Sequence, residues 1–346
     1  MEILTGNNIL AGLDSYFKDN GYDNLYIITD HNVKYYHGKY LSSLLKGYNY
    51  KFYSIPPGEK SKSIDVVLSI YDDLIENQID RESLIIAFGG GVVGDITGFV
   101  AATFKRGIDY IQIPTTLLAQ VDSSIGGKVG IDYKGLKNII GSFHFPKLIL
   151  IDIQLLKTLS NRDITSGLAE ILKYGLIADY DLFNYISSNL SKAYNKDEHF
   201  LLDLVNKSIS IKQDIVSRDK FDKGERRILN FGHTVGHSIE SYFDFSQYNH
   251  GEAVILGMIY ESYIGKEVGL IDDDYFWEIY NSLTKLITPL KFNDLEIKYL
   301  LEIMENDKKK LNDQTILILP IGKGKVGIFN DVDVDLIINS LKGEWF

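Results

Sequence analysis

The sequence predicts an α/β N-terminal domain with a Rossmann-like parallel sheet, followed by a mostly α-helical C-terminal domain. Two observations support this prediction. Up to about residue 158, short β-branched or aromatic runs alternate with segments of helical period, which is typical of parallel strands covered by helices. After that point, long helical-period segments take over. A length of 346 residues fits two domains, which we place at residues 1–158 and 159–346.

Five strands are expected in the first half, each ending at a turn residue or at a change of pattern. They cover residues 25–28, 50–55, 84–88, 110–113 and 147–153. Between the second and the third strand, residues 64–75 place their apolar side chains on one helical face. Short strands separated by helices favour a sheet that is buried on both sides.

The second half is expected to consist of helices joined by short loops. The helical-period segments are residues 166–177, 200–216, 233–243, 252–268 and 274–283. Near the end of the chain, strand-like runs at residues 315–320 and 326–329 flank a turn rich in glycine and lysine. This pattern predicts one small β-hairpin within the helical half.

Charge and composition exclude several classes of function. The sequence has 36 basic and 47 acidic residues, and the net charge of −11 argues against non-specific nucleic-acid binding. Because there is no cysteine, disulfides, thiolate zinc sites and cysteine nucleophiles are excluded, whereas zinc can still bind histidine and carboxylate. The N-terminus shows no signal-peptide pattern and no apolar run approaches about 20 residues. We therefore expect a cytoplasmic protein without a membrane partner.

A glycine-rich turn joins a predicted strand to a predicted helix at residues 89–95. Gly89, Gly91 and Gly94 spell G-x-G-x-x-G, a pattern that lets backbone N–H groups approach a pyrophosphate. A tight turn also needs glycine for packing alone, so the pattern leaves both interpretations open. Here the turn follows the third predicted strand, and the nearest acid at the usual spacing is Asp109. A dinucleotide site at this turn would therefore be a variant one.

A second polar stretch, residues 114–128, follows the next predicted strand. It contains two pairs of hydroxyl residues, two glycines, Asp122 and Lys128. Ligands of open α/β sheets bind at the carboxyl ends of the strands, and a capping loop needs fewer polar groups. We therefore favour a ligand site over a simple capping loop.

Three of the seven histidines lie within one short stretch of the second half. His233 and His237 are four residues apart on one helical face, and His250 is expected in a tight connection between helices. Glu170 and Lys173 lie three residues apart in an otherwise apolar helix. A single histidine on an apolar face is more often a core residue, but this group favours a catalytic zinc held by two histidines and a glutamate. Spacing alone pairs His233 with His237, and Glu170 completes the set.

Several sequence blocks, in the same order, resemble the 3-dehydroquinate synthase family and together span nearly the whole chain. The blocks are residues 57–62, 89–95, 98–103, 105–107, 120–128, 137–138, 167–175, 229–240, 250–253 and 307–309. Any single block would be a weak signal. The resemblance implies a dehydroquinate synthase-like fold and membership of the sugar phosphate cyclase superfamily.

The same resemblance implies the site residues. Zinc (or cobalt) would be held by Glu170, His233 and His250, so that His237 becomes a substrate-site residue. NAD contacts would fall on Asp30, Glu59, Lys62, Gly91, Val92, Val93, Gly94, Asp95, Thr115, Thr116, Lys128, Lys137 and Thr158, in place of Asp109. Catalytic roles would fall on Asp122, Lys128, Lys173, Asn230 and His237, and substrate binding on Arg106, Lys137, Asn138, Lys212, Arg226 and Lys308.

The implied activity is that of a lyase in the shikimate pathway, which leads to chorismate and the aromatic amino acids. The substrate would be 3-deoxy-D-arabino-heptulosonate 7-phosphate, and the products would be 3-dehydroquinate and phosphate. The steps are oxidation at C5 by NAD, phosphate elimination, reduction at C5, ring opening and aldol closure, without net release of NADH. The basic residues would bind the phosphate and carboxylate of the substrate. The resemblance also implies a homodimer.

Three other interpretations remain open. A related sugar phosphate cyclase would keep zinc and NAD but alter the carboxylate-binding residues, so Arg226, Asn230 and Lys308 favour the dehydroquinate enzyme. A metal-dependent polyol dehydrogenase would turn NAD over and accumulate NADH. A non-catalytic nucleotide-binding regulator would have no need for the three predicted metal ligands together.

Overall fold

The chain divides into two compact units, which are described separately. The computed structural model describes residues 2–134, 136–244, 246–311 and 316–346, and of residues 306–311 it describes the backbone. Unit 1 comprises Met1–Ile164 and Ala193–Ile209, and unit 2 comprises Thr165–Lys192 and Ser210–Phe346. Unit 1 thus includes a segment that lies well beyond the predicted boundary at residue 158.

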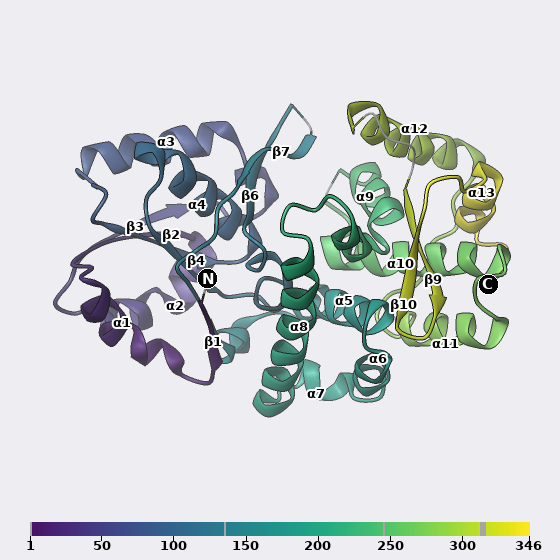
Figure 1. Cartoon of the computed structure of the whole chain (residues 1–346), viewed down its shortest axis with the longest axis horizontal. Coiled ribbons are helices and arrows are strands. Elements are labelled where there is room, and N and C mark those ends of the chain that lie inside the picture. Colours follow the sequence, from purple (N-terminus) through teal and green to yellow (C-terminus); the bar gives the residue numbers. More distant parts are fainter. Residues whose placement is uncertain (1, 135, 245, 312–315) are drawn as a thin grey trace. The chain divides into compact units, whose positions relative to one another are not determined.

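Unit 1 is built on a six-stranded parallel sheet, which confirms the predicted fold class (Figure 1). The strand order is β1-β8-β5-β4-β2-β3. The strands are β1 (Glu2–Gly6), β2 (Asn24–Asp30), β3 (Asn49–Ile55), β4 (Leu84–Gly89), β5 (Tyr110–Pro114) and β8 (Leu148–Asp152). Strand β1, which was not among the predicted strands, pairs with β8 at the sheet edge. The glycine turn therefore follows the fourth strand of the chain and not the third.

Side chains alternate between the two faces of this sheet, and helices cover both faces (Figure 1). From β2, Tyr26 and Ile28 pack into a core with α3 (Ile64–Glu76) and α4 (Gly91–Thr103). Leu25 and Ile27 point the other way, into a core with α1 (Leu13–Asn20) and α2 (His31–Leu44). Burial on both faces explains why the inner strand β4 has no polar side chain, whereas the edge strand β3, which is partly exposed, contains Asn49, Lys51 and Ser54.

The other elements of unit 1 before residue 159 are short. They are the 3₁₀ turns η1 (Ile9–Gly12), η2 (Glu59–Ser61), η3 (Phe104–Arg106) and η5 (Ile153–Thr158), the π-helical turn η4 (Ala119–Ser123), and the antiparallel pair β6 (Lys128–Tyr133) and β7 (Leu136–Phe143). The β6–β7 pair was not predicted, because glycines and polar residues interrupt its apolar pattern.

The second half of the chain is mostly helical, as predicted. Its helices are α5 (Asn161–Ile177), α6 (Tyr180–Ser187), α7 (Leu190–Tyr194), α8 (Glu198–Arg218), α9 (His233–Tyr242), α10 (His250–Glu267), α11 (Asp273–Leu283), α12 (Asp294–Leu311) and α13 (Val334–Lys342), with the 3₁₀ turn η6 (Glu225–Asn230). The predicted hairpin is present as β9 (Leu317–Gly322) and β10 (Lys325–Phe329), although residue 315 lies outside the described residues. Helices α6, α7, α12 and α13 were not predicted.

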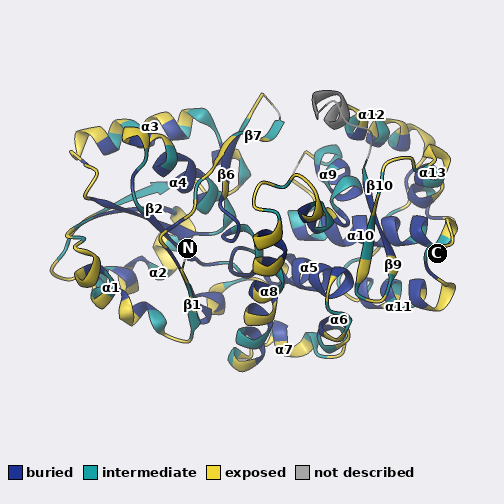
Figure 2. Cartoon of the chain, viewed as in Figure 1, coloured by how far each residue is buried: buried dark blue, intermediate teal, exposed yellow. Residues whose placement is uncertain are grey.

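Helix α10 is buried along most of its length (Figure 2). Its residues Leu256, Tyr260 and Ile264 belong to an apolar core of unit 2, together with residues of α9, α12 and α13. A helix enclosed in this way is a rigid support for the side chains at its ends. Among the described residues, none of the helices has the length and apolar character that a membrane crossing requires.

Candidate metal centre and glycine turn

Three helices of unit 2 bring Glu170, His233 and His250 together. The Oε1 atom of Glu170 lies 3.7 Å from Nε2 of His233 and 3.4 Å from Nε2 of His250. Glu170 is fully buried, and its Oε1 accepts no hydrogen bond from the described residues. A buried carboxylate oxygen is costly without a partner, and one that faces two imidazole nitrogens fits a metal ion. The donor set of one carboxylate and two imidazoles suits zinc or cobalt.

Lys173 supports the ionised form of this carboxylate. Its ammonium group, which is also buried, donates to Oε2 of Glu170 from one turn along the same helix. Burial alone would raise the pKa of Glu170, but Lys173 and the two imidazoles outweigh burial and hold that pKa well below its usual value. These neighbours therefore favour the ionised form of Glu170, which is the form that a metal ligand must have.

The two histidines differ in what faces their second nitrogen. Nδ1 of His233 lies 3.1 Å from the carbonyl oxygen of Phe231, whereas Nδ1 of His250 lies 3.6 Å from Oε2 of Glu240. In both residues Nε2 is the atom that points to Glu170. Burial and Lys173 hold the pKa of His233 well below its usual value. Burial also acts to lower the pKa of His250, but Glu170 and Glu240 outweigh it and raise that pKa to about 9.

His237 lies beside the same cluster, one turn along α9. Its ring centre is 5.2 Å from that of His233 and 5.7 Å from that of His250. With Glu240 and His250, it forms a second group whose ligand atoms lie within 4.8 Å of one another. The spacing argument that joined His233 and His237 thus identified neighbours, but Glu170 faces His233 and His250.

Close helix contacts explain how residues so far apart in sequence meet. A Cβ on Gly251 would lie 2.4 Å from Cα of Ser166, so the start of α10 rests directly on α5, one turn before Glu170. A Cβ on Gly257 would lie 1.8 Å from the carbonyl oxygen of Gly232, so α9 and α10 also cross closely. His250 is the first residue of α10, and the prediction that it lies in a connection between helices was wrong.

In unit 1, the glycine turn leads from β4 into α4. The N-cap residue Gly90 has no side chain, so the first N–H groups of α4 have no side-chain cap. Strand β2 has β3 on one side and β4 on the other, so the chain order reverses between β2 and β4. Asp30, at the end of β2, and the glycine turn therefore lie at the carboxyl edge of adjacent strands, where open α/β sheets bind nucleotides. Asp109 precedes β5 and so lies at the opposite edge.

Three hydroxyl groups near this turn have no hydrogen-bond partner within the described part of the chain. The side-chain oxygens of Thr115, Ser123 and Ser124 are buried and form no hydrogen bond with the described residues. A Cβ on Gly91 would lie 2.9 Å from the hydroxyl of Ser123, so the two residues adjoin across the turn. Unfilled donors beside uncapped N–H groups fit a phosphate-rich cofactor such as NAD. Ser123 and Ser124 were not predicted individually, although their doubled hydroxyls marked the stretch.

A buried lysine links several predicted residues of unit 1. Nζ of Lys62 lies 2.6 Å from Oδ2 of Asp95 and 3.8 Å from Oε1 of Glu59, and it donates to the side-chain oxygen of Asn138. Nζ of Lys137 lies 3.9 Å from the same Glu59 oxygen. Burial acts against the charge of Lys62, but the carboxylates outweigh it and raise the pKa of Lys62. Five of the predicted site residues thus form one polar cluster.

Other predicted residues occupy separate positions in unit 1. Arg106 is exposed in a turn where Lys105, Arg106 and Gly107 all have positive φ. Thr158 lies 2.9 Å from Nε2 of His37, and the hydroxyl of Thr116 accepts from the N–H group of Ala119. Val92, Val93 and Gly94 lie in the first turns of α4, Asp122 lies in η4, and Lys128 begins β6.

In unit 2, two of the cations predicted to bind the substrate are buried, in addition to Lys173. Lys212 is 5% exposed and Arg226 is 4% exposed, and the guanidinium of Arg226 donates to the carbonyl oxygen of Lys220. Asn230 ends η6, just before α9. The side chain of Lys308 lies outside the described residues.

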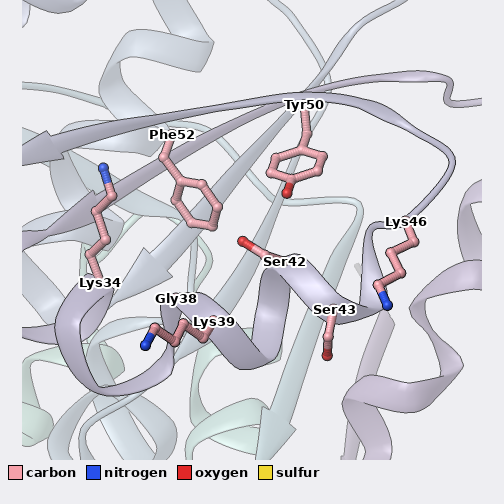
Figure 3. Close-up of a pocket in the computed structure, with 8 residues that line it drawn as sticks. All are labelled: Lys34, Gly38, Lys39, Ser42, Ser43, Lys46, Tyr50 and Phe52. Atoms are coloured by element: carbon pink, nitrogen blue, oxygen red, sulfur yellow. The ribbon is translucent and has the colours of Figure 1, made fainter.

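A groove of about 510 Å³ lies between α2 and β3, and none of the predicted site residues lines it (Figure 3). Its lysines, Lys34, Lys39 and Lys46, are exposed, and its aromatic residues are Tyr50 and Phe52. Water solvates such exposed ammonium groups, so the groove lacks the buried polar groups that mark the metal cluster and the glycine turn.

Comparison with known proteins identifies relatives over most of the chain. Residues 52–166 match the family model for the 3-dehydroquinate synthase N-terminal region, and residues 167–310 match that for the C-terminal region. A 3-dehydroquinate synthase of Alkaliphilus metalliredigens is 44% identical over 324 residues, which is 94% of this chain and 90% of that protein.

Two solved structures of synthases have the same fold as this chain. ValA, a 2-epi-5-epi-valiolone synthase from Streptomyces hygroscopicus with NAD+ and Zn2+ bound, has a TM-score of 0.90 at 26% identity and covers 98% of this chain and 95% of its own. A 2-deoxy-scyllo-inosose synthase complexed with carbaglucose-6-phosphate, NAD+ and Co2+ has a TM-score of 0.87 at 26% identity, with 98% and 96% covered. The sequence identity to the 3-dehydroquinate synthase is thus higher than that to these two synthases.

Proposed function

The chain belongs to the 3-dehydroquinate synthase family, and we propose that it converts 3-deoxy-D-arabino-heptulosonate 7-phosphate into 3-dehydroquinate and phosphate. NAD and a zinc or cobalt ion are its cofactors, and NAD is regenerated in each cycle. The observation that carries the proposal beyond family membership is the buried Oε1 atom of Glu170, which faces two imidazole nitrogens.

In unit 2, Glu170, His233 and His250 would hold the metal. When bound, the ion supplies Lewis acidity that favours loss of the proton from the substrate hydroxyl at the carbon to be oxidised. Lys173 keeps Glu170 ionised through its hydrogen bond to Oε2. His237, beside the ligands, and Asn230 would orient the substrate hydroxyls.

Cationic side chains would bind the phosphate and carboxylate of the substrate. The support is the burial of Lys212 and Arg226 in a chain of net charge −11, because a cation is rarely buried without an anionic or hydrogen-bonding role. Arginine can hold a carboxylate or phosphate through two parallel hydrogen bonds, and lysine acts as a point charge. We assign the same substrate-binding role to Arg106, Lys128, Lys137, Asn138 and Lys308, and an orienting role at the reacting hydroxyls to Asp122.

In unit 1, the glycine turn would hold NAD. Its pyrophosphate would lie against the N–H groups of Gly91 and the following residues of α4, with the hydroxyls of Thr115 and Thr116 nearby. Asp30 already accepts hydrogen bonds from the N–H groups of Asn32 and Val33, at 2.8 and 2.9 Å, and its carboxylate would also accept from a ribose hydroxyl. The remaining NAD contacts are assigned to Val92, Val93, Gly94, Glu59, Lys62, Asp95, Lys128, Lys137 and Thr158.

Phosphate release is the direct test of this function. Purified protein is incubated with the heptulosonate 7-phosphate, NAD and zinc, and again after a chelator, while absorbance reports NADH. We expect phosphate release that the chelator abolishes and no accumulation of NADH. Steady accumulation of NADH with a polyol would instead assign a dehydrogenase.

The same assay would give a different result if the chain were a related sugar phosphate cyclase. The inosose synthase among the structural neighbours binds a carba-analogue of glucose 6-phosphate. If glucose 6-phosphate released phosphate and the heptulosonate did not, the proposed substrate would be wrong while the proposed cofactors would stand.

We also propose that the chain acts as a homodimer in the cytoplasm, as the family resemblance implies. Light scattering of the purified protein would give twice the mass of one chain, 39.2 kDa, if this is correct. A single-chain mass at the concentrations used for the activity assay would contradict the dimer.

A further inference from the structure

Helix α9 carries His233 and His237 but has no N-cap side chain of its own. Its N-cap residue, Gly232, has a left-handed backbone with φ of 78° and offers no acceptor to the first turn. Helix α10 differs, because Asn249 and Glu252 close its N-terminus with a reciprocal pair of hydrogen bonds. The first N–H groups of α9 therefore need an acceptor from another element.

Glu261, in α10, provides that acceptor. Its Oε2 accepts from the N–H group of Gly232 at 2.7 Å, and its Oε1 accepts from that of Val235 at 3.3 Å. The N–H group of Thr234 also faces this carboxyl group. Glu261 is fully buried, and its partners are backbone N–H groups and not a basic side chain. A buried carboxyl group in such surroundings indicates a specific role, because burial without compensation is costly.

We propose that Glu261 is a positioning residue that fixes the first turn of α9 and thereby the place at which His233 presents Nε2. The N–H groups that it binds lie on both sides of His233, so any shift of this turn moves the ligand itself. Because Glu261 belongs to the same helix as His250, it also ties the two histidine-bearing helices together. The proposal rests on the metal centre of the proposed function, and its test therefore measures metal binding and not turnover.

A purely structural cap would lower stability without changing the metal site, so metal affinity separates the two roles. Titration with Co2+ gives both the affinity and a ligand-field spectrum that reports coordination geometry. We expect Glu261→Ala to weaken Co2+ binding by about tenfold to a hundredfold, as found for outer partners of metal ligands, and to alter the spectrum. Glu261→Gln keeps an acceptor oxygen and should restore most of the affinity.

Asp152 offers a matched control in unit 1. It is fully buried, and its carboxylate accepts from the N–H groups of Asn8, Leu10 and Gln154 at 3.0, 3.3 and 3.0 Å. Asp152→Asn and Asp152→Ala should therefore lower the melting temperature but leave the Co2+ affinity and spectrum unchanged.

The result that would overturn the proposal is a Glu261→Ala variant that is less stable yet binds Co2+ within about twofold of the original chain, with the same spectrum. If Glu261→Ala does not fold, Glu261→Gln decides through amide hydrogen exchange at residues 232–235. Its amide keeps one acceptor oxygen but places a donor against the other N–H group, so the proposal requires the exchange rate and the Co2+ affinity to change together. Faster exchange at these residues with unchanged Co2+ binding rejects it. Failure of the unaltered chain to bind Co2+ would instead reject the metal centre of the proposed function.

Discussion

The candidate metal centre of unit 2 (Glu170, His233 and His250) and the glycine turn of unit 1 would hold their proposed cofactors in opposite ways. The cluster uses side chains from three helices, with two imidazole nitrogens 3.4 and 3.7 Å from one buried carboxylate oxygen. The turn uses backbone N–H groups at the start of α4 and small hydroxyl residues. A side-chain site depends on tertiary packing, whereas a backbone site depends on a short local sequence. Substitutions should therefore affect the two sites independently and by different amounts.

The largest effect is expected from Glu170→Gln. This change removes the anionic ligand and leaves the buried ammonium of Lys173 without its carboxylate. Metal catalysis supplies several kcal/mol of transition-state stabilisation, so we expect kcat/KM to fall by about 10³-fold, at about 1.4 kcal/mol per tenfold. Metal content by elemental analysis should fall from one equivalent to none, while NADH binding followed by fluorescence stays unchanged. A variant that retained one tightly bound ion would contradict the assignment of Glu170.

A smaller effect is expected from Glu240→Gln. Glu240 faces Nδ1 of His250 at 3.6 Å and so orients the imidazole whose Nε2 points to Glu170. Outer partners of this kind typically contribute about tenfold to a hundredfold in metal affinity. Competition with a chelating dye measures the change. Glu267→Gln is the matched control, because Glu267 is more exposed, ends the helix α10 that begins with His250, and pairs with Lys266. Equal affinities for the two variants would remove Glu240 from the site.

A substitution in the glycine turn should change the affinity for the other cofactor, NAD. In Gly91→Val, the new Cβ would lie 2.9 Å from the hydroxyl of Ser123, so this hydroxyl or the turn itself must shift from the place where the cofactor phosphate is expected. Loss of one charge-assisted hydrogen bond is worth about 1.5–3 kcal/mol, and we therefore expect the NAD dissociation constant to rise by about tenfold or more. Gly12→Val is the control, since a Cβ there would meet nothing within 4 Å. Weaker Co2+ binding by Gly91→Val would show that the two sites are not independent.

The same difference explains what the sequence could and could not predict. The glycine turn and the central strands were predicted because their signals are local, with apolar runs that end at glycine or proline. Strand β1 was missed because Glu2–Gly6 is short and lies at the sheet edge, where its side chains are only partly buried. The closeness of His250 and Glu170 depends on the contact between Gly251 and Ser166, which no spacing in the sequence reveals. Among the sequence arguments, only the family resemblance placed His250 and Glu170 in the same metal site.

The smallest effect is expected in the pH dependence of the free energy of unfolding, through Glu261, which caps α9. Burial raises the pKa of Glu261 to about 8, against the opposing pull of the backbone N–H groups. Between about pH 4.5 and 8 the unfolded chain has lost this proton and the folded chain still holds it, so the free energy of unfolding falls as pH rises. One carboxyl group gives a slope of at most about 1.4 kcal/mol per pH unit.

Urea unfolding of the metal-free chain at several pH values measures this slope, and Glu261→Gln is the comparison because it cannot titrate. The variant should show a flatter profile between about pH 4.5 and 8, and the difference between the two profiles isolates Glu261 from His250. The carboxyl group of Glu261, protonated or ionised, and the amide of glutamine each offer an oxygen that can accept from the N–H group of Gly232. Co2+ binding by the variant should therefore stay close to that of the original chain. Parallel profiles would mean that Glu261 is ionised throughout, held so by the three N–H groups of α9. The cap would then be an anion at a helix N-terminus, and the glutamine variant would lose more affinity than expected.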